Sequence, residues 1–328
     1  MDKKVMLLRS NEFGEPIVSI IMPLYNKASQ VLNTIESVKA QTVTNWELIV
    51  VDDGSTDGGA ALVDELQDFR IRVVRQVNAG VSVARNNGIN CANSELIAFL
   101  DADDIWRPKF LKSILNLVVD FPDAQWYATG YEIQPLGSAS YISRLRGKEC
   151  FQRGLLVDYF EKAARSDPPV FTSATCVQRS AICSIGGFPE GIANGEDLVT
   201  WARLAVRYPL AYDTRPFVLY CVSGLYRNAD PAQKVTAMLN QLLREYPRIK
   251  GLSRYLGLWY RMQAVQAIHF NESSGARYYA RMAVRHGPTQ WRNVYTLLLT
   301  YFPSRLRSII DAVLRKTINE LSSKTQIK

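Results

Sequence analysis

Histidine and cysteine are scarce in this 328-residue chain, which holds 2 histidines and 5 cysteines. The odd cysteine count and the lack of a CxxC pair argue against a disulfide framework or a zinc site, and favour a reducing compartment. His269 and His286 fall on helical stretches, where we expect structural or solvated side chains. No GxxxxGK[ST] or GxGxxG stretch occurs, which removes the main support for a P-loop or dinucleotide-binding protein.

Long hydrophobic runs are also missing. The segment Met1–Ser10 lacks the apolar core of a signal peptide, and the longest lipid-compatible stretch, Val294–Phe302, is far shorter than the roughly 20 residues of a spanning helix. These absences predict a cytoplasmic protein. The chain is 47% hydrophobic and 21% charged, which is typical of a folded enzyme rather than a disordered or polytopic membrane protein.

Charge is distributed unevenly along the chain. Residues 1–226 carry 22 Lys and Arg against 26 Asp and Glu, whereas residues 227–328 carry 17 against 5. The last third is therefore basic, which indicates an anionic partner. No nucleic-acid-binding module is recognisable, so we expect no nucleic acid. Apolar residues alternate with arginines from Arg292 to Lys316, and two interpretations stay open: an interfacial helix on an anionic membrane, or a helix packed on the rest of the protein.

Hydrophobic periodicity predicts the fold class. β-branched runs predict strands at 17–22, 48–51, 71–74 and 96–100, with amphipathic helices between them. This βαβ series predicts an α/β domain with a mostly parallel sheet. Past Tyr226 the periodicity is helical, so we predict an α/β catalytic domain over 1–228 and a basic helical region over 229–328.

Polar clusters follow each of the four predicted strands. They are Pro23–Asn26, Asp52–Ser55, Asn78–Gly80 and Asp101–Asp104. Because the carboxyl ends of parallel strands meet at one edge of a sheet, we expect these clusters to form one ligand crevice.

Two acidic turns stand out among these clusters. Asp101 and Asp103 have the spacing to hold a divalent cation between a sheet edge and phosphate oxygens, or they are only an acidic turn with Asp104 as a helix N-cap. Asp53 is placed to accept a base N–H or a ribose hydroxyl, or it belongs to an ordinary tight turn. Arg85 is placed to reach the base or the phosphates, or it lies on a solvated helix face.

Four stretches, in this order, resemble the family 2 glycosyltransferases of the GT-A fold, a Rossmann-like α/β architecture. They are Val18–Asn26, Glu47–Asp57, Gly80–Gly88 and Ile97–Asp104. The resemblance covers roughly residues 16–208. It implies inverting transfer of a hexosyl or N-acetylhexosaminyl group from a nucleoside diphosphate sugar, with a UDP-sugar favoured, to a hydroxyl of a glycan or lipid-linked acceptor. A bacterial envelope polysaccharide is the implied product.

The resemblance also implies roles for individual residues. Asp103, with Asp101, would bind Mn²⁺ or Mg²⁺, and Asp101 would face the ribose. Asp197 would be the base that takes the acceptor proton, with Glu196 beside it; without the resemblance, both can simply stabilise a helix N-terminus. The remaining residues of the nucleotide-sugar site would be Pro23, Tyr25, Asn26, Asp53, Gly80, Arg85 and Ala102.

Two departures from the family pattern narrow this interpretation. The QxxRW element of processive members is absent, which favours a single-addition enzyme. The family's Tyr-Arg-x-His segment has Tyr226 and Arg227 here but Asn228 and Ala229 after them, so the role of that histidine has no counterpart. A nucleotidyltransferase and a catalytically silent sugar-nucleotide-binding protein remain alternative functions.

Overall fold

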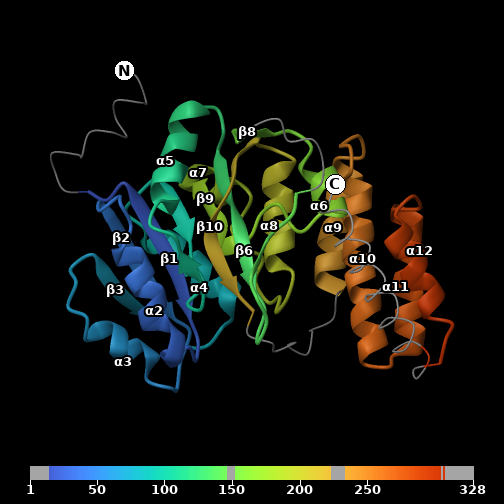
Figure 1. The fold of residues 1–328 in the computed structure, drawn as a ribbon, viewed down its shortest axis with the longest axis horizontal. Helices are drawn as coiled ribbons and strands as arrows, with labels where there is room; N and C mark the ends of the chain where they lie inside the picture. Colours follow the sequence, from blue (N-terminus) through green and yellow to red (C-terminus); the bar gives the residue numbers. More distant parts are fainter. Residues whose placement is uncertain (1–14, 146–151, 223–232, 304–305, 307–328) are drawn as a thin grey trace. The chain divides into compact units, whose positions relative to one another are not determined.

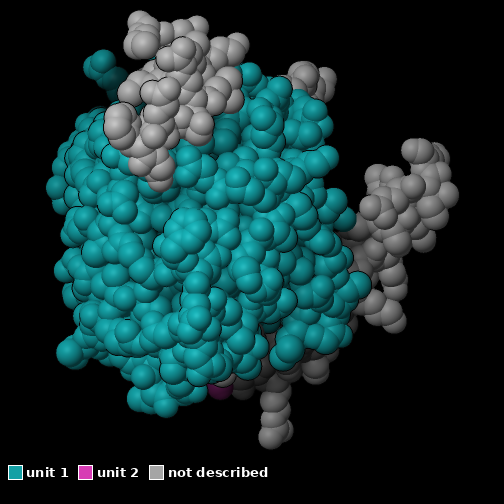
Figure 2. Space-filling view, turned by 90° about the vertical axis from the view of Figure 1, so that its left-hand side faces the viewer, with its two compact units in different colours: residues 1–249 teal, residues 250–328 magenta. Residues whose placement is uncertain are grey.

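The computed structural model describes residues 15–145, 152–222, 233–303 and 306. The chain forms two compact units, residues 1–249 and residues 250–328. The first is coloured teal in Figure 2. The predicted domain boundary at residue 228 and the Tyr226–Ala229 segment lie outside the described residues.

One ten-stranded sheet forms the centre of the first unit, in the order β3-β2-β1-β4-β9-β6-β10-β5, with β7 on β6 and β8 on β10 (Figure 1). The first four strands along the chain are β1 (Val18–Leu24), β2 (Trp46–Asp52), β3 (Ile71–Arg75) and β4 (Leu96–Phe99). They are mutually parallel, with β1 between β2 and β4. The predicted βαβ series is therefore confirmed.

The sequence explains why β1 and β2 lie in the interior of the sheet. All seven residues of β2 are buried, and Ile20, Ile21 and Met22 of β1 are fully buried. Burying one aliphatic side chain contributes about 1.5–3 kcal/mol, so a strand that is apolar on both faces is stable only when both faces are covered by helices. From β1, the chain adds β2 and β3 on one side and then β4 on the other side of β1. The carboxyl end of β1 is therefore a topological switch point, where a crevice opens.

The other half of the sheet is mixed. It contains β5 (Ile105–Trp106), β6 (Trp126–Gln134), β7 (Tyr141–Ile142), β8 (Arg153–Leu156), β9 (Thr175–Gln178) and β10 (Leu210–Cys221). β6 and β10 are parallel, whereas β9 runs antiparallel to both β4 and β6. A 3₁₀ turn, η1 (Thr172–Ala174), directly precedes β9. The long strand β10 was not predicted.

Helices cover the sheet. Those of the first unit are α2 (Ala28–Lys39), α3 (Gly59–Asp64), α4 (Val81–Cys91), α5 (Phe110–Asp120), α6 (Tyr159–Arg165), α7 (Arg179–Ser184), α8 (Glu196–Ala205) and α9 (Gln233–Glu245). α4 packs on β1 and β2, and α5 packs on β6 and β10. Gly88 brings α4 close to the sheet, since a Cβ there would overlap the side chain of Ile21. This close approach places the preceding turn of α4, with Arg85, beside the end of β4.

The second unit contains the helices α10 (Leu252–His269), α11 (Ser273–His286) and α12 (Trp291–Leu299), which pack on one another (Figure 1). The predicted helical C-terminal region is confirmed. His286 lies within it, stacked on Tyr260 with ring centroids 5.5 Å apart. No helix in the described ranges combines the length and hydrophobicity needed to cross a membrane.

Candidate active site

A cleft of about 480 Å³ opens at the carboxyl ends of β1, β2 and β4. Ten of the eleven predicted site residues line it, drawn from stretches more than 170 positions apart in the chain: Pro23, Tyr25, Asp53, Gly80, Arg85, Asp101, Ala102, Asp103, Glu196 and Asp197. These residues come together because three parallel strands end at the same edge and the turn before α8 faces them.

Asn26 is the predicted site residue that is not among those lining the cleft in the described part of the chain. Its backbone is left-handed, with φ of 50°. Its side-chain oxygen accepts a hydrogen bond from Thr56 N–H at 2.9 Å, and its own N–H donates to Ser55 Oγ at 3.2 Å. Asn26 therefore joins the loop after β1 to the loop after β2.

Asp53 is buried and its carboxylate holds the turn that precedes α4. Oδ1 accepts hydrogen bonds from Ala79 N–H at 2.8 Å and from Gln76 Nε2 at 2.7 Å, while Oδ2 accepts from Gly80 N–H at 2.9 Å. Gly80 has φ of 93°, a conformation that favours glycine. Asp53 thus shapes the wall of the cleft between β2 and α4.

Three aspartates follow β4, and each has a different environment. Asp101 Oδ1 accepts a hydrogen bond from Arg85 at 2.7 Å, and Asp103 Oδ2 accepts one from Lys27 Nζ at 2.5 Å. Asp104 is buried, where it accepts from the Ser173 hydroxyl at 2.5 Å and from Cys221 N–H at 3.0 Å. Burial, and next the charge of Asp101, raise the pKa of Asp104 well above its usual range.

Asp104 is therefore a structural member of this group. It does not cap the following helix, which begins at Phe110, and instead ties the turn after β4 to η1 and to the end of β10. Asp101 and Asp103 keep side chains that are 28% and 20% exposed toward the cleft. These two carboxylates are the ones that solutes in the cleft can reach.

Arg85 links two walls of the cleft. Its buried guanidinium donates through one terminal nitrogen to Asp101 and through the other to Glu196 Oε1 at 3.0 Å. Burial acts to lower the pKa of Arg85, but Asp101 and Glu196 outweigh it and raise that pKa. The guanidinium also lies over the Phe188 ring, 5.0 Å from its centroid. Arg85 thus holds the end of β4 against the start of α8.

Glu196 and Asp197 form the first turn of α8, directly after Gly195 with φ of 87°. Asp197 Oδ1 accepts a hydrogen bond from Leu198 N–H at 2.7 Å. Burial, and next the adjacent charge of Glu196, raise the pKa of Asp197 to about 7. A carboxylate with a pKa near neutrality is suited to take a proton at physiological pH.

Several cleft residues were missed by sequence reasoning. They are Lys27, Val81, Phe171, Thr172, Ala193, Asn194, Gly195, Tyr220 and Cys221. Lys27 immediately follows the predicted Pro23–Asn26 turn, so its position was a usable signal. Tyr220 and Cys221 lie at the end of β10, where Arg215 and Pro216 interrupt the apolar sequence pattern of the strand.

Trp201 is a core residue. It is 1% exposed and lies within 6.2 Å of both Phe99 and Trp126, measured between ring centroids. Its ring is covered by aromatic neighbours and does not line the cleft among the residues described.

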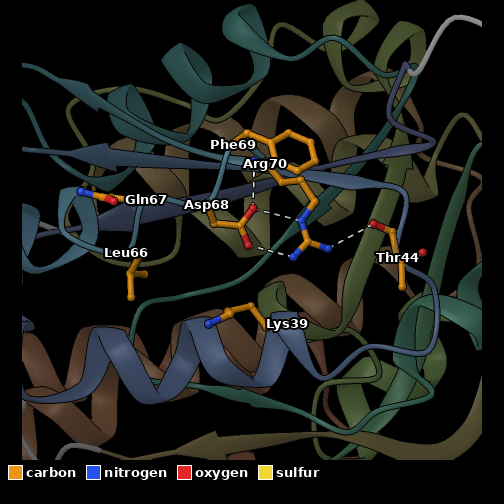
Figure 3. A pocket seen from close by; sticks show the side chains of 7 residues that line it. All are labelled: Lys39, Thr44, Leu66, Gln67, Asp68, Phe69 and Arg70. Carbon is orange, nitrogen blue, oxygen red and sulfur yellow. Dashed lines mark hydrogen bonds and ion pairs between the residues drawn. The ribbon is translucent and has the colours of Figure 1, made fainter.

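A second hollow, of about 610 Å³, lies between the end of α2 and the turn before β3 (Figure 3). Its charged groups are largely paired with one another. Arg70 Nε and Nη2 donate to the Asp68 carboxylate at 3.1 and 2.8 Å, and the guanidinium lies 4.0 Å from the ring centroid of Trp46. The side-chain hydrogen bond from Arg70 lowers the pKa of Asp68. The Arg70–Asp68 ion pair fixes the turn before β3 and offers no reactive group.

The residues of the cleft fit a divalent cation that is coordinated partly by the protein and partly by phosphate oxygens of a bound ligand. No cluster of three or more His, Cys, Asp or Glu arranged for a metal occurs in residues 15–145, 152–222 and 233–303. The partly exposed carboxylates of Asp101 and Asp103 nevertheless face the cleft, and the ammonium group of Lys27 lies against Asp103. A hard cation such as Mg²⁺ is commonly held by one or two carboxylates together with phosphate oxygens, and this donor set matches that case.

Comparison with known proteins gives the same family for the N-terminal part. Residues 19–168 match the family model "Glycosyl transferase family 2". Over 104 residues the chain is 41% identical to WfgD of Escherichia coli, a UDP-Glc:alpha-D-GlcNAc-diphosphoundecaprenol beta-1,3-glucosyltransferase, covering 31% of this chain and 41% of WfgD. Over 193 residues it is 33% identical to an uncharacterized glycosyltransferase of Rickettsia felis, covering 57% of this chain and 30% of that protein. The matched segments span less than half the length of these relatives.

Solved structures show the fold. TarS of S. aureus, residues 1–349, aligns with a TM-score of 0.62 at 13% identity, covering 89% of this chain and 88% of that one. TarS was also solved with UDP-GlcNAc, and that structure aligns with a TM-score of 0.52 at 15% identity over 86% of this chain and 90% of that one. The mannosyltransferase PcManGT of Pyrobaculum calidifontis, solved with GDP-Man and Mn²⁺, aligns with a TM-score of 0.55 at 19% identity, covering 94% and 90%. The predicted GT-A fold is confirmed.

The two ion pairs of Arg85 predict a large effect on stability. We expect Arg85→Met to lower the free energy of unfolding by about 3 kcal/mol, because it leaves Asp101 and Glu196 without their shared cation. The double variant Arg85→Met/Glu196→Gln should recover part of this loss, giving a coupling energy in a double-mutant cycle measured by urea unfolding. Arg153→Met, which removes the exposed pair with Asp120, should change stability by less than about 1 kcal/mol. Equal effects of Arg85→Met and Arg153→Met would contradict this assignment.

Proposed function

We propose that this protein, whose residues 19–168 match the family model "Glycosyl transferase family 2", is an inverting, metal-dependent glycosyltransferase. It moves a sugar from a nucleoside diphosphate sugar to a hydroxyl group of a glycan or lipid-linked acceptor. The observation that carries the proposal is a single cleft lined by both a partly exposed aspartate pair, Asp101 and Asp103, and a carboxylate of raised pKa, Asp197.

The donor is proposed to be a UDP-sugar. The complex of TarS with UDP-GlcNAc and the UDP-Glc named for WfgD support this base. Pro23, Tyr25 and Asp53 would line the nucleoside, at the ends of β1 and β2. Gly80 and Ala102 would allow the diphosphate close to the backbone, and Asn26 would act by fixing the loop after β1.

Metal chemistry is proposed for the other half of the donor site. Asp103, with Asp101, would hold Mn²⁺ or Mg²⁺, as the Mn²⁺ in the PcManGT structure suggests for a protein of this fold. A cation bound there supplies positive charge that offsets the negative charge developing on the leaving diphosphate. Arg85 orients Asp101 for this role through its buried hydrogen bond.

The configuration at the anomeric carbon is inverted because the acceptor displaces the diphosphate directly. The acceptor oxygen forms a bond to the anomeric carbon as the bond from that carbon to the diphosphate oxygen breaks. The acceptor proton passes to the carboxylate of Asp197, which must be ionised to receive it. Glu196 accepts a hydrogen bond from Arg85 and fixes the turn that carries Asp197.

The acceptor and product are proposed from the relatives and from the missing processive element. WfgD extends a sugar carried on diphosphoundecaprenol, and the chain lacks a QxxRW stretch. We infer a single addition of a hexosyl or N-acetylhexosaminyl group during synthesis of a bacterial envelope polysaccharide. A nucleotidyltransferase would use the aspartate pair without Asp197, and a silent binding protein would use neither, so the variants below distinguish these three functions.

We expect Asp103→Ala and Asp197→Ala each to lower transfer at least 1000-fold while leaving the thermal unfolding transition close to that of the wild type. The first removes a metal ligand, and the second removes the proton acceptor. Transfer is measured by release of UDP from a panel of UDP-sugars with Mn²⁺ and a polyprenyl-diphosphate-sugar acceptor. Asp68→Ala, at the second hollow, is the matched control and should retain activity. Wild-type turnover by Asp197→Ala would exclude the proposed base.

The raised pKa of Asp197 predicts the pH dependence of catalysis. The ionised form is the active one, so kcat/KM should fall about tenfold per pH unit below a midpoint near 7. Glu196→Gln removes the neighbouring negative charge that helps to raise this pKa, and should move the midpoint to lower pH. Both profiles are measured from pH 5.5 to 8.5 at saturating Mn²⁺. A midpoint below pH 5 in the wild type would contradict the assignment of Asp197.

The second unit is proposed to bind an anionic membrane surface from the cytoplasmic side. α12 has an unusual distribution of polarity, because Asn293, Thr296 and the following Thr300 are buried. Asn293 Nδ2 donates to Ala283 O at 2.8 Å and to Gly287 O at 3.1 Å, which binds α12 to the end of α11. Polar residues thus hold α12 in place within the unit.

The outward side of α12 is apolar and aromatic. Trp291 is 59% exposed and Leu298 is 56% exposed, with Val294 and Tyr301 also exposed at helical spacing between and after them. Between Leu252 and Leu299 the chain has six arginines and one glutamate. The guanidinium of one of these arginines, Arg292, lies over the Trp291 ring. Apolar side chains beside arginines are the makeup of a surface that inserts shallowly into an anionic bilayer.

We expect the full chain to float with vesicles of phosphatidylcholine and phosphatidylglycerol, and to float much less with phosphatidylcholine alone. The double variant Trp291→Ala/Leu298→Asp should reduce binding to the anionic vesicles about tenfold or more, because two inserted apolar groups are lost. Phe69→Ala is the control, since Phe69 is 97% exposed on the first unit and should have no effect. Equal flotation with neutral and anionic vesicles would exclude this surface.

A further inference from the structure

Lys27 has no role in the proposed chemistry, yet its ammonium group lies 2.5 Å from the Asp103 carboxylate. The pair is partly exposed, with side chains 22% and 20% accessible. Both residues line the cleft. The carboxylate proposed to bind a divalent cation is therefore already paired with a cation that belongs to the chain.

The backbone around Lys27 is fixed by the loop after β2, so the position of this side chain is not incidental. On one side, Asn26 is held by Ser55 and Thr56. On the other side, Ala28 N–H donates to Asp57 Oδ2 at 2.8 Å, and this hydrogen bond is the main cause of the lowered pKa of Asp57. Lys27 thus leaves a braced turn at the start of α2 and reaches into the cleft on a flexible four-carbon stem.

The charges of the cleft explain why an accessible lysine is important for binding a diphosphate. Its lining includes the acidic residues Asp53, Asp101, Asp103, Glu196 and Asp197 and the basic residues Lys27 and Arg85. Arg85 is only 3% exposed and is committed to two carboxylates. Among the described lining residues, Lys27 is consequently the one cation that is accessible to a ligand. A diphosphate entering this acidic cleft needs positive charge that it can reach.

We propose that Lys27 is an exchangeable counter-ion: it neutralises Asp103 until a divalent cation takes that carboxylate, and its released ammonium then binds the donor diphosphate. This inference rests on the proposed function of the same cleft. It makes metal binding and donor binding cooperative, since the metal frees the lysine and the diphosphate receives it. Cation competition lowers the affinity for metal in the absence of donor, and linkage requires the reciprocal effect on donor affinity.

Two opposite effects of Lys27→Met test the proposal on the full chain. Without nucleotide, Mn²⁺ affinity measured by electron paramagnetic resonance should rise about tenfold, because no ammonium competes for Asp103. At saturating Mn²⁺, UDP affinity measured by calorimetry should fall about tenfold, whereas uridine, which lacks the diphosphate, should bind as in the wild type. Lys27→Arg keeps the charge and should show neither the gain in Mn²⁺ affinity nor the full loss of UDP affinity.

Lys39→Met is the matched control, since Lys39 pairs with Glu36 at 2.7 Å on the exposed side of α2. It should match the wild type in both measurements. Thermal unfolding confirms folding, and Lys27→Gln replaces Lys27→Met if the latter is unstable. Unchanged Mn²⁺ affinity, or UDP and uridine weakened alike, would overturn the exchange while leaving the proposed function intact. Failure of the wild type to bind Mn²⁺ even with UDP would overturn the exchange and the metal dependence together.

Discussion

The buried guanidinium of Arg85 is the interaction on which the candidate site depends. Three carboxylates, those of Asp101, Glu196 and Asp197, face one cleft from segments that are almost 100 residues apart. Like charges at such a place repel, and removing them from water is costly. One planar cation with two terminal nitrogens balances Asp101 and Glu196 at once. Arg85 therefore sets the spacing between the end of β4 and the start of α8.

The fold provides the position from which Arg85 can do this. α4 lies directly on β1 and β2 because Gly88 has no side chain to hold it away from Ile21. Asp53 fixes the turn before the helix through three hydrogen bonds. The helix thus begins at a fixed point beside the reversal in strand order. A site made of several chain segments is positioned by this sheet edge, not by any one loop.

The charged residues of the cleft differ in how buried they are and in how they are paired. Arg85 is enclosed and paired, whereas Lys27 is accessible and paired only with a partly exposed carboxylate, Asp103. Asp104 is buried with a raised pKa and serves to tie β10 to the turn after β4. The same acidic run therefore contains one structural aspartate and two that face ligands. Neighbouring residues of the same type differ here because Asp104 is buried against Ser173 and Cys221, whereas Asp101 and Asp103 line the cleft.

Sequence alone determined the βαβ half of the sheet, because buried parallel strands are continuous apolar runs and the helices between them have their own period. It also determined which polar clusters end those strands, and hence most of the cleft lining. It did not reveal β10, where Thr214, Arg215 and Pro216 interrupt the pattern and the pairing with β6 shifts in register. Strand pairing across distant segments depends on tertiary contacts that no local period records.

Only the tertiary structure decided what each charged residue contacts. The sequence placed Arg85 near a ligand, and the folded chain commits both of its terminal nitrogens to carboxylates. It gave no sign that Lys27 meets Asp103, 76 positions further along. Ion pairs and pKa values arise from distance and burial, which are properties of the packed chain. Residue type and spacing therefore identify the chemistry that is present, while packing decides which groups are paired and which remain accessible.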